Sequence, residues 1–254
     1  MTPPAATALI TGAAKRIGRA IAEDLAAHGF AVAVHYNRSR AEAEDLVASI
    51  VGRGGRAAAV RADLTNMDST AKLVAAAAER LGPVSLLVNN ASLFEDDSAT
   101  DFGWEAWDRH FAVHVKAPAL LAREFSRVLP KNREGLVVNI VDQRVRRLTP
   151  RYFSYTLSKS ALWTATQTLA QALAPNIRVN AIGPGPTLPN SRQAPSDFAA
   201  QVDGLILKRG PELAEFGRTI RYLWDAPSVT GQMIAIDGGQ HLAWQTPDVT
   251  GMVE

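Results

Sequence analysis

The feature that most constrains the fold of this chain is the alternation of short apolar runs with longer amphipathic segments. The apolar runs predict strands at Ala8–Thr11, Ala31–Tyr36, Ala57–Arg61, Val84–Asn89, Leu136–Val141, Ile177–Ile182 and Met233–Ile236. Near-continuous apolar strands separated by helices indicate a parallel sheet that is covered on both faces. Because crossovers between parallel strands are right-handed, the pattern predicts an α/β fold with one doubly wound sheet of about seven strands.

The length of 254 residues is enough for one large core and requires no second domain. We therefore expect a single Rossmann-type domain over residues 1–254. The stretch Gly183–Pro195 is rich in proline and glycine and predicts a loop within this domain. The last residues, from about 240 to 254, carry weak structure signals and are expected to form a tail.

The charge balance and the residue types exclude several classes of function. Lys and Arg number 27 against 25 Asp and Glu, without a long basic tract, which argues against a nucleic-acid partner. The chain has no cysteine, so disulfides, thiolate metal ligands and cysteine nucleophiles are excluded. No apolar run approaches the roughly 18 residues of a membrane span, so we expect a cytoplasmic protein without a membrane partner. Among the histidines only His110 and His114 have a ligand-like spacing, and no acidic motif accompanies them, so no metal site is predicted.

Tyr155 and Lys159 are the candidate catalytic pair. They are four residues apart in a segment with helical periodicity, which places both side chains on one face. An ammonium about one turn from a phenol favours the phenolate, so we expect Lys159 to lower the pKa of Tyr155 toward neutrality. The spacing alone is weak evidence, because it also occurs by chance in soluble helices. Asp142 stands thirteen residues before Tyr155 and completes the candidate set.

The first predicted strand is followed by a glycine turn that opens a helix. The turn runs from Thr11 to Arg19, and the helix carries Ile17, Ile21 and Leu25 on one face. Such a turn presents backbone N–H groups and a helix N-terminus to a phosphate group. The glycine spacing differs from G-x-G-x-x-G, so by itself the turn could equally be an ordinary glycine turn.

Taken together, these motifs resemble the short-chain dehydrogenase/reductase family. The marks are the turn T-G-x-x-x-[GR]-x-G, Asp63-Leu64, Asn89-Asn90-Ala91, Tyr155-x-x-x-Lys159, Arg178-Val179-Asn180 and Pro184-Gly185. The resemblance implies a nicotinamide-dependent oxidoreductase, in which Asp63 and Leu64 lie near the adenine and the Pro184–Thr187 segment lies against the nicotinamide. The implied cofactor residues are Gly12, Arg16, Ile17, Gly18, Asp63, Leu64, Asn89, Ala91, Tyr155, Lys159, Pro184, Gly185 and Thr187. The alternatives are a helix cap for Asp63 and a satisfied strand-end amide for Asn89.

The end of the second predicted strand indicates the type of nicotinamide cofactor. The residues there are His35, Tyr36, Asn37, Arg38 and Ser39, and none of them is the carboxylate that binds the ribose 2′-hydroxyl of NAD. Arginine, serine and asparagine suit a 2′-phosphate instead. We therefore predict NADP(H), bound at His35, Asn37, Arg38 and Ser39 with Arg16 nearby, although Arg38 could be a solvated loop charge.

Within the family, the sequence resembles the pteridine reductases and dihydromonapterin reductases. Arg16 in the turn, the stretch HYNRS, the stretch Asn89–Phe94 and Asp142 carry this resemblance, since most members have a serine at the position of Asp142. It implies hydride transfer to a C=N bond of a pterin or folate, with proton relay through Tyr155 and Asp142. Arg16, Ser92, Phe94, Asp142 and Tyr155 would hold the substrate, and Phe94 would stack on the ring or, alternatively, be tucked into the core.

Several points remain open in the sequence. His114 stands where the family usually has an asparagine whose backbone carbonyl binds a relay water. The arginines at 144, 146, 147 and 151 form a basic loop that would border the pocket, and segment Phe102–Leu129 resembles a surface used for homotetramers. A reductase of a ketone or a 3-ketoacyl thioester shares every cofactor mark, and a non-catalytic, NADP-sensing binding protein is a third alternative.

Overall fold

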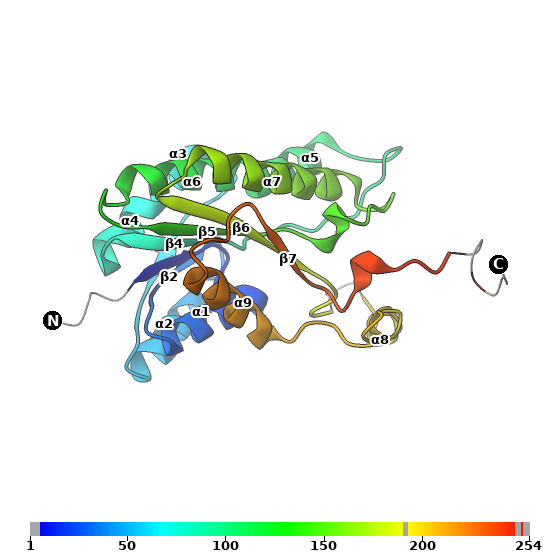
Figure 1. Cartoon of the computed structure of the whole chain (residues 1–254), viewed down its shortest axis with the longest axis horizontal. Coiled ribbons are helices and arrows are strands. Elements are labelled where there is room, and N and C mark those ends of the chain that lie inside the picture. Colours follow the sequence, from blue (N-terminus) through cyan, green and yellow to red (C-terminus); the bar gives the residue numbers. More distant parts are fainter. Residues whose placement is uncertain (1–5, 190–192, 247–249, 251–254) are drawn as a thin grey trace.

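One parallel sheet organises the chain, whose computed structural model describes residues 6–189, 193–246 and 250. The described strands are β1 (Thr7–Ile10), β2 (Ala31–Tyr36), β3 (Arg56–Arg61), β4 (Val84–Asn89), β5 (Gly135–Ile140), β6 (Ile177–Pro184) and β7 (Met233–Ile236). They form a seven-stranded sheet in the order β3-β2-β1-β4-β5-β6-β7, and every adjacent pair is parallel (Figure 1). The order reverses at β1, so the prediction of a doubly wound parallel sheet is confirmed.

The strand bounds agree closely with the predicted ones. Strands β2, β4 and β7 begin and end at the predicted residues, whereas β6 continues to Pro184. Gly183 and Pro184 pair with Ala235 and Ile236 of β7, so the predicted loop from Gly183 starts two residues too early.

Helices cover both faces of the sheet. On one face lie α1 (Arg16–Ala27), α2 (Arg40–Gly52) and α9 (Leu213–Asp225), and on the other α4 (Leu73–Leu81), α6 (Ala117–Val128) and α7 (Phe153–Ala172) (Figure 1). Short elements complete the described chain: α3 (Met67–Ala71), α8 (Pro195–Asp203) and the 3₁₀ turns η2 (Gln143–Val145) and η3 (Gln240–Leu242). No helix in the described ranges is long and apolar enough to cross a membrane.

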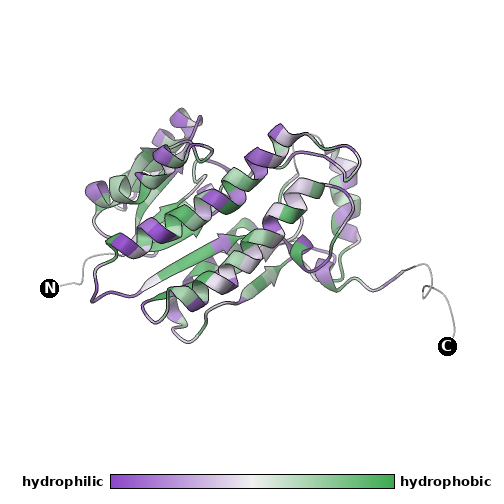
Figure 2. Ribbon diagram, turned by 90° about the horizontal axis from the view of Figure 1, so that it is seen from above, coloured by the Kyte–Doolittle hydropathy of each residue, from purple (hydrophilic) through white to green (hydrophobic). Residues whose placement is uncertain are grey.

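The core forms two layers because successive strand side chains point to opposite faces. Ile10 belongs to the layer under α1, α2 and α9, and its neighbour Leu9 belongs to the layer under α4 and α6. Green apolar strands enclosed by helices with hydrophilic parts are visible in Figure 2. Fully buried side chains such as Phe125 and Phe216 each contribute roughly 1.5–3 kcal/mol of burial free energy.

A long helical segment contains a local change of pitch. Helix α5 (Trp104–Phe111) continues through a π-helical turn, η1 (Ala112–Lys116), into α6, close to the predicted span Phe102–Leu129. Pro118 has no N–H, so it cannot donate the bond that the carbonyl of His114 would accept in a regular α-helix. Single π-helical turns of this kind are frequent at functional sites.

The predicted C-terminal tail is described only in part. Its first residues form η3, and residues 247–249 and 251–254 lie outside the described ranges. At the carboxyl ends of the parallel strands, the loops that follow β1, β2, β4, β5 and β6 come together, which is where α/β sheets of this type bind ligands.

Candidate active site

The three predicted catalytic residues lie together at the carboxyl end of the sheet. Tyr155 and Lys159 are one turn apart on α7, and Asp142 follows β5. The Tyr155 hydroxyl donates a hydrogen bond of 2.8 Å to Oδ2 of Asp142, and Nζ of Lys159 donates one of 2.8 Å to the Ile140 carbonyl. Tyr155 is 5% exposed and Lys159 is 2% exposed. The tertiary structure therefore forms one buried cluster from these side chains.

The electrostatics of this cluster differ from the expectation for Tyr155. Burial, followed by the charge and hydrogen bond of Asp142, raises the pKa of Tyr155 well above its ordinary value of 10. The prediction that Lys159 lowers the pKa of this phenol is wrong here, because Asp142 contacts the hydroxyl directly while Nζ of Lys159 lies 5.7 Å from the ring centre. Burial also lowers the pKa of Lys159 from 10.5 to about 8. At neutral pH the Tyr155 hydroxyl therefore holds a proton that it can donate.

Both oxygens of the Asp142 carboxylate have hydrogen-bond partners. The backbone N–H of Arg144 donates to Oδ1 over 2.9 Å, so Asp142 caps the 3₁₀ turn η2. The Arg144 guanidinium approaches Oδ2 at 3.5 Å. A capped carboxylate with a nearby cation is held in one orientation toward Tyr155.

The turn between β1 and α1 has the backbone shape that its glycines allow. Gly12 has φ +62°, and a Cβ there would come within 3.0 Å of the backbone of Ala91. A Cβ at Gly18 would lie 2.3 Å from the Gly12 carbonyl. Helix α1 has no acidic residue in its first turn, so its N-terminus favours an anion. The turn thus fits a phosphate group closely approached by backbone.

His35 sets the position of this turn from the neighbouring strand. The Gly12 N–H donates a hydrogen bond of 2.9 Å to Nδ1 of His35, which leaves Nε2–H to donate to the Ala62 carbonyl over 3.2 Å. Burial lowers the pKa of His35 to about 4, so the ring is neutral at pH 7. His35 borders the cavity described next, but both of its ring nitrogens are committed to the protein's own backbone.

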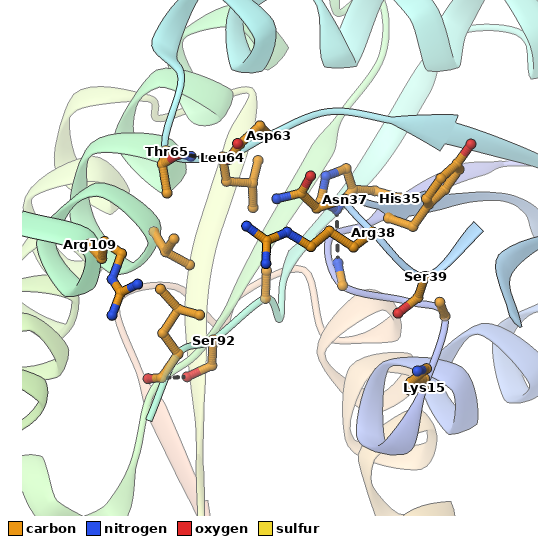
Figure 3. A pocket seen from close by; sticks show the side chains of 16 residues that line it. Lys15, His35, Asn37, Arg38, Ser39, Asp63, Leu64, Thr65, Ser92 and Arg109 are labelled. Carbon is orange, nitrogen blue, oxygen red and sulfur yellow. Dashed lines mark hydrogen bonds between the residues drawn. The ribbon is translucent and has the colours of Figure 1, made fainter. Parts of the chain in front are cut away.

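A cavity of about 400 Å³ opens beside the turn (Figure 3). Nine of the predicted cofactor and substrate residues line it: Gly12, His35, Asn37, Arg38, Ser39, Asp63, Leu64, Ala91 and Ser92. The sequence analysis did not identify the other lining residues, which are Ala14, Lys15, Tyr36, Thr65, Leu93, Arg109 and Val113. Of these, only Lys15 and Tyr36 had a signal, because they lie inside motifs that were already recognised.

The charges around the cavity suit a phosphorylated ribose. Arg38 reaches across the cavity from the end of β2 (Figure 3), and no carboxylate lies in residues 35–39. Asp63 on the facing wall accepts hydrogen bonds from the N–H and hydroxyl of Thr65 at 2.9 and 2.7 Å. These bonds, and to a lesser extent the charge of Arg38, lower the pKa of Asp63. Asp63 thus acts as a local cap, while cationic and amide donors are left facing the cavity.

An aromatic stack lies beside the catalytic cluster on the side where the substrate is expected. The Phe94 ring stacks on Tyr152 at 4.4 Å and meets Tyr155 edge-on at 4.8 Å. The Arg144 guanidinium lies 5.5 Å from the Phe94 ring centre and 5.0 Å from that of Tyr152. Tyr152 was not predicted, and it adopts a left-handed conformation, with φ 57°, directly before α7. Phe94 is therefore placed next to Tyr155 rather than in the core.

The predicted basic loop is held to the C-terminal part of the chain. Arg146 donates to the Met233 carbonyl at 3.2 Å, and Arg147 donates to the Gln240 carbonyl at 3.3 Å. Arg151 pairs with exposed Asp96 at 3.3 Å. Two of these arginines thus fix the loop itself, which the sequence did not indicate.

Arg16, predicted to bind cofactor and substrate, contacts a different segment. Its guanidinium donates to the carbonyls of Pro189 and Leu188 at 3.1 and 3.3 Å. Its φ of 53° is unusual for a residue other than glycine, as expected for a turn under close constraint. Arg16 therefore joins the glycine turn to the loop after β6.

The remaining predicted residues occupy strand ends. The Asn89 amide donates to Oδ1 of Asn139 at 2.8 Å, which matches the alternative of a strand-end amide. Gly185 closely approaches Asp237, where a Cβ would lie 2.7 Å from its Cα, and Thr187 donates to the Gly185 carbonyl at 3.0 Å. Asn89, Pro184, Gly185, Thr187, Arg16, Ile17 and Gly18 do not line the cavity.

Comparison with known proteins identifies the family. The family model described as Enoyl-(Acyl carrier protein) reductase matches residues 12–241. The chain belongs to the short-chain dehydrogenase/reductase family. Among curated proteins, this short-chain dehydrogenase/reductase is similar to a 3-oxoacyl-[acyl-carrier-protein] reductase of Synechocystis sp., at 30% identity over 245 residues, covering 92% of this chain and 96% of the relative.

Solved structures include more similar members of the family. FolM alternative dihydrofolate reductase 1 from Brucella suis, in complex with NADP, is 60% identical, with a TM-score of 0.95 over 96% of this chain and 98% of that chain. The corresponding protein of Brucella canis, also complexed with NADP, is 59% identical with a TM-score of 0.95, over 97% of this chain and 98% of that one. The resemblance predicted from the motifs is therefore confirmed, including its pteridine-reductase-like branch.

Proposed function

We propose that this short-chain dehydrogenase/reductase is an NADPH-dependent reductase of dihydropterin- or dihydrofolate-type substrates. The observation that carries the proposal is the 2.8 Å hydrogen bond from the Tyr155 hydroxyl to the carboxylate of Asp142. A carboxylate at this position can accept and relay a proton, which a serine hydroxyl that holds a carbonyl does less readily. Reduction of a C=N bond requires protonation of a ring nitrogen, and this pair supplies the proton path.

NADP(H) is the cofactor, as the sequence predicted. The solved relatives at 60% and 59% identity are complexes with NADP. In this chain, Arg38, Asn37 and Ser39 are placed to hold the 2′-phosphate, and the N-terminus of α1 is placed to hold the pyrophosphate. When bound, the nicotinamide supplies the hydride.

The chain's own residues orient the substrate and move the proton. Tyr155, whose pKa is raised, holds its proton at neutral pH and donates it to the substrate. Asp142 accepts the hydrogen bond of that hydroxyl and returns a proton from the solvent side, where its side chain is 16% exposed. Lys159, with a pKa of about 8, carries a positive charge for most of the neutral range and lies under the same ring. These steps are general acid catalysis by a fixed donor.

The aromatic stack favours a planar heterocycle over a flexible acyl chain. Phe94 and Tyr152 present parallel rings next to Tyr155, and Arg144 provides a planar cation within the same stack. Flat π systems such as pterins bind such surfaces through stacking. Ser92 also contributes, since its hydroxyl hydrogen-bonds with Tyr155 and lowers the pKa of the phenol slightly against the larger effects.

A panel of substrates tests this function. NADPH oxidation is measured with an uncharged dihydropterin, with dihydrofolate, with a simple ketone and with a 3-ketoacyl thioester. We expect turnover with the pterin or folate and little with the carbonyl compounds. Efficient reduction of the thioester without pterin turnover would contradict the proposal and favour the activity named for the Synechocystis relative.

We further propose a homotetramer in the cytoplasm, as expected for this family. The helices α5, α6 and α7 offer the matching surface, and Trp104 on α5 is 67% exposed. Sedimentation equilibrium of the purified protein tests the assembly. A monomer at micromolar concentration would contradict it.

A further inference from the structure

Two buried histidines lie behind the candidate site and take no part in the proton path described above. His110 ends the regular part of α5 and His114 lies in the π-helical turn η1, and they are 0% and 1% exposed. Their rings are nearly parallel, with centres 5.6 Å apart. No group of His, Cys, Asp or Glu in the described chain could hold a metal ion, so another role is needed.

His114 joins the segment after β4 to the catalytic helix. The backbone N–H of Leu93 donates a hydrogen bond of 3.1 Å to its Nε2, and the Ser92 hydroxyl lies 3.0 Å from the same nitrogen. Because Nε2 accepts, the proton of the neutral ring is on Nδ1, which donates to Ser158 over 2.8 Å. The Ser158 hydroxyl in turn donates to the carbonyl of Tyr155 at 2.7 Å.

His110 repeats this pattern one turn away. The N–H of Glu95 donates to its Nε2 at 3.3 Å, so Nδ1–H donates to the Ser154 hydroxyl at 2.7 Å. Ser154 passes the chain on by donating its hydroxyl proton to the carboxylate of Asp97. The N–H of Ser154 also donates to both oxygens of Asp97, at 3.2 and 3.3 Å. Both histidines therefore connect alternate residues of one segment to the first turns of α7.

The neutral state of the rings is a condition for this arrangement. Burial lowers the pKa of His114 well below 6.5, and the charge of Lys159 and the neighbouring His110 add to the effect. Burial also lowers the pKa of His110, while Glu95 and Asp97 oppose the shift and Arg109 and Lys159 support it. A protonated ring would place an N–H at Nε2, opposite the backbone N–H that donates there.

We infer that His110 and His114 are positioning residues that fix the backbone of residues 92–95 against α7 and thereby set the distance between Phe94 and Tyr155. This inference rests on the proposed function, in which Phe94 stacks on the substrate and Tyr155 protonates it. The ring of Tyr155 lies between the two, 4.8 Å from Phe94 and 5.4 Å from His114, and both contacts are edge-on. A shift of about 1 Å between such groups is enough to reduce turnover strongly.

The tautomers give a direct test that needs no substrate. In ¹⁵N NMR spectra of the full chain at pH 7, His110 and His114 should each show a protonated Nδ1 and an unprotonated Nε2. In H114L and H110L, amide hydrogen exchange at Leu93 and Glu95, respectively, should be about tenfold faster than in the wild type. H28L is the matched control, because His28 is exposed and bonds only within its own helix region. A protonated Nε2, or unchanged exchange in both variants, would overturn the inference.

A double-mutant cycle tests the effect on the reaction. H114L should raise the KM for the dihydropterin by about tenfold in the wild-type background and by less than about twofold in an F94L background. H114Q, whose amide oxygen can accept from Leu93, should recover a large part of the loss. Equal effects of H114L in both backgrounds would reduce His114 to a merely structural role. If the wild type does not turn over pterins at all, the proposed function fails, while the tautomer and exchange measurements still judge the two histidines.

Discussion

The backbone N–H of Gly12 and Nδ1 of His35 are joined by a 2.9 Å hydrogen bond that ties the glycine turn to the end of β2. A glycine with φ +62° has little local reason to keep that conformation, because glycine also populates many others. The bond from His35 holds it in the single shape that leaves room for a phosphate. The histidine in the HYNRS stretch thus acts through the turn rather than by touching a cofactor.

The stability of the protein should depend on pH through His35. Its pKa is about 4 in the folded protein against 6.5 for a free histidine, so the unfolded chain binds more protons between these values. The free energy of unfolding therefore falls as the pH drops through this window, by about 2 kcal/mol between pH 7 and pH 5. Urea unfolding of wild type and H35N at both pH values measures the contribution, which H35N should lack. The exposed-site variant H28N should retain it.

Arg38 should carry much of the preference for NADPH over NADH. The wild type is expected to prefer NADPH by about tenfold or more in kcat/KM, since lost charge-assisted contacts to a 2′-phosphate cost roughly 1.5–3 kcal/mol. R38A should remove most of this preference and leave kcat/KM for NADH nearly unchanged. Lys15, which is paired with Glu42 at 2.6 Å, provides the comparison, and K15A should have the smaller effect. Equal use of both cofactors by the wild type would contradict the role of this cation.

Tyr155→Phe should separate binding from chemistry. The substitution removes the proton donor but keeps the ring in contact with Phe94 and His114, so the Kd for NADPH should stay within about twofold while kcat falls by about 10². Fluorescence titration gives the first quantity and steady-state kinetics the second. A variant that keeps most of its turnover would show that another group donates the proton.

Asp142 is the sharpest test of the substrate class. D142N preserves size and hydrogen bonding but cannot relay a proton, so pterin turnover should fall by about 10² with normal NADPH binding. D142S restores the hydroxyl that most of the family has at this position, and weak ketone reduction is expected to appear. Full pterin activity in D142N would leave the fold and the cofactor unaffected but would refute the proposed proton path.

The basic loop should divide into two functional groups. Arg146 and Arg147 bond carbonyls of Met233 and Gln240, so the double variant R146Q/R147Q should loosen the loop and raise the KM for dihydrofolate and an uncharged dihydropterin alike. Arg151 is exposed and carries only a surface ion pair, so R151Q should raise the KM for dihydrofolate alone, and added salt should mimic the effect. Measuring both KM values at low and high salt distinguishes the groups. A selective loss in the double variant would assign anion binding to the whole loop.

The sequence by itself determined the sheet and the sites that recur in local motifs. Apolar runs and helical periodicity located every strand of the described sheet within two residues, because burial on both faces imposes a pattern that can be read locally. The glycine turn, the residues after β2 and the Tyr155–Lys159 spacing were recognisable for the same reason. The absence of an acid at the end of β2 sufficed to predict NADP(H), which the NADP complexes of the Brucella relatives support.

Only the tertiary structure decided how these residues act on one another. Asp142 and Tyr155 meet through the packing of β5 against α7, and this contact raises the pKa of the phenol where the helical spacing alone had predicted that Lys159 would lower it. His110 and Ser154 are 44 residues apart, and Phe94 reaches Tyr152 only because the latter leaves the usual backbone region. Such contacts depend on the direction of side chains after the loops close, and short-range propensity carries no information about that direction.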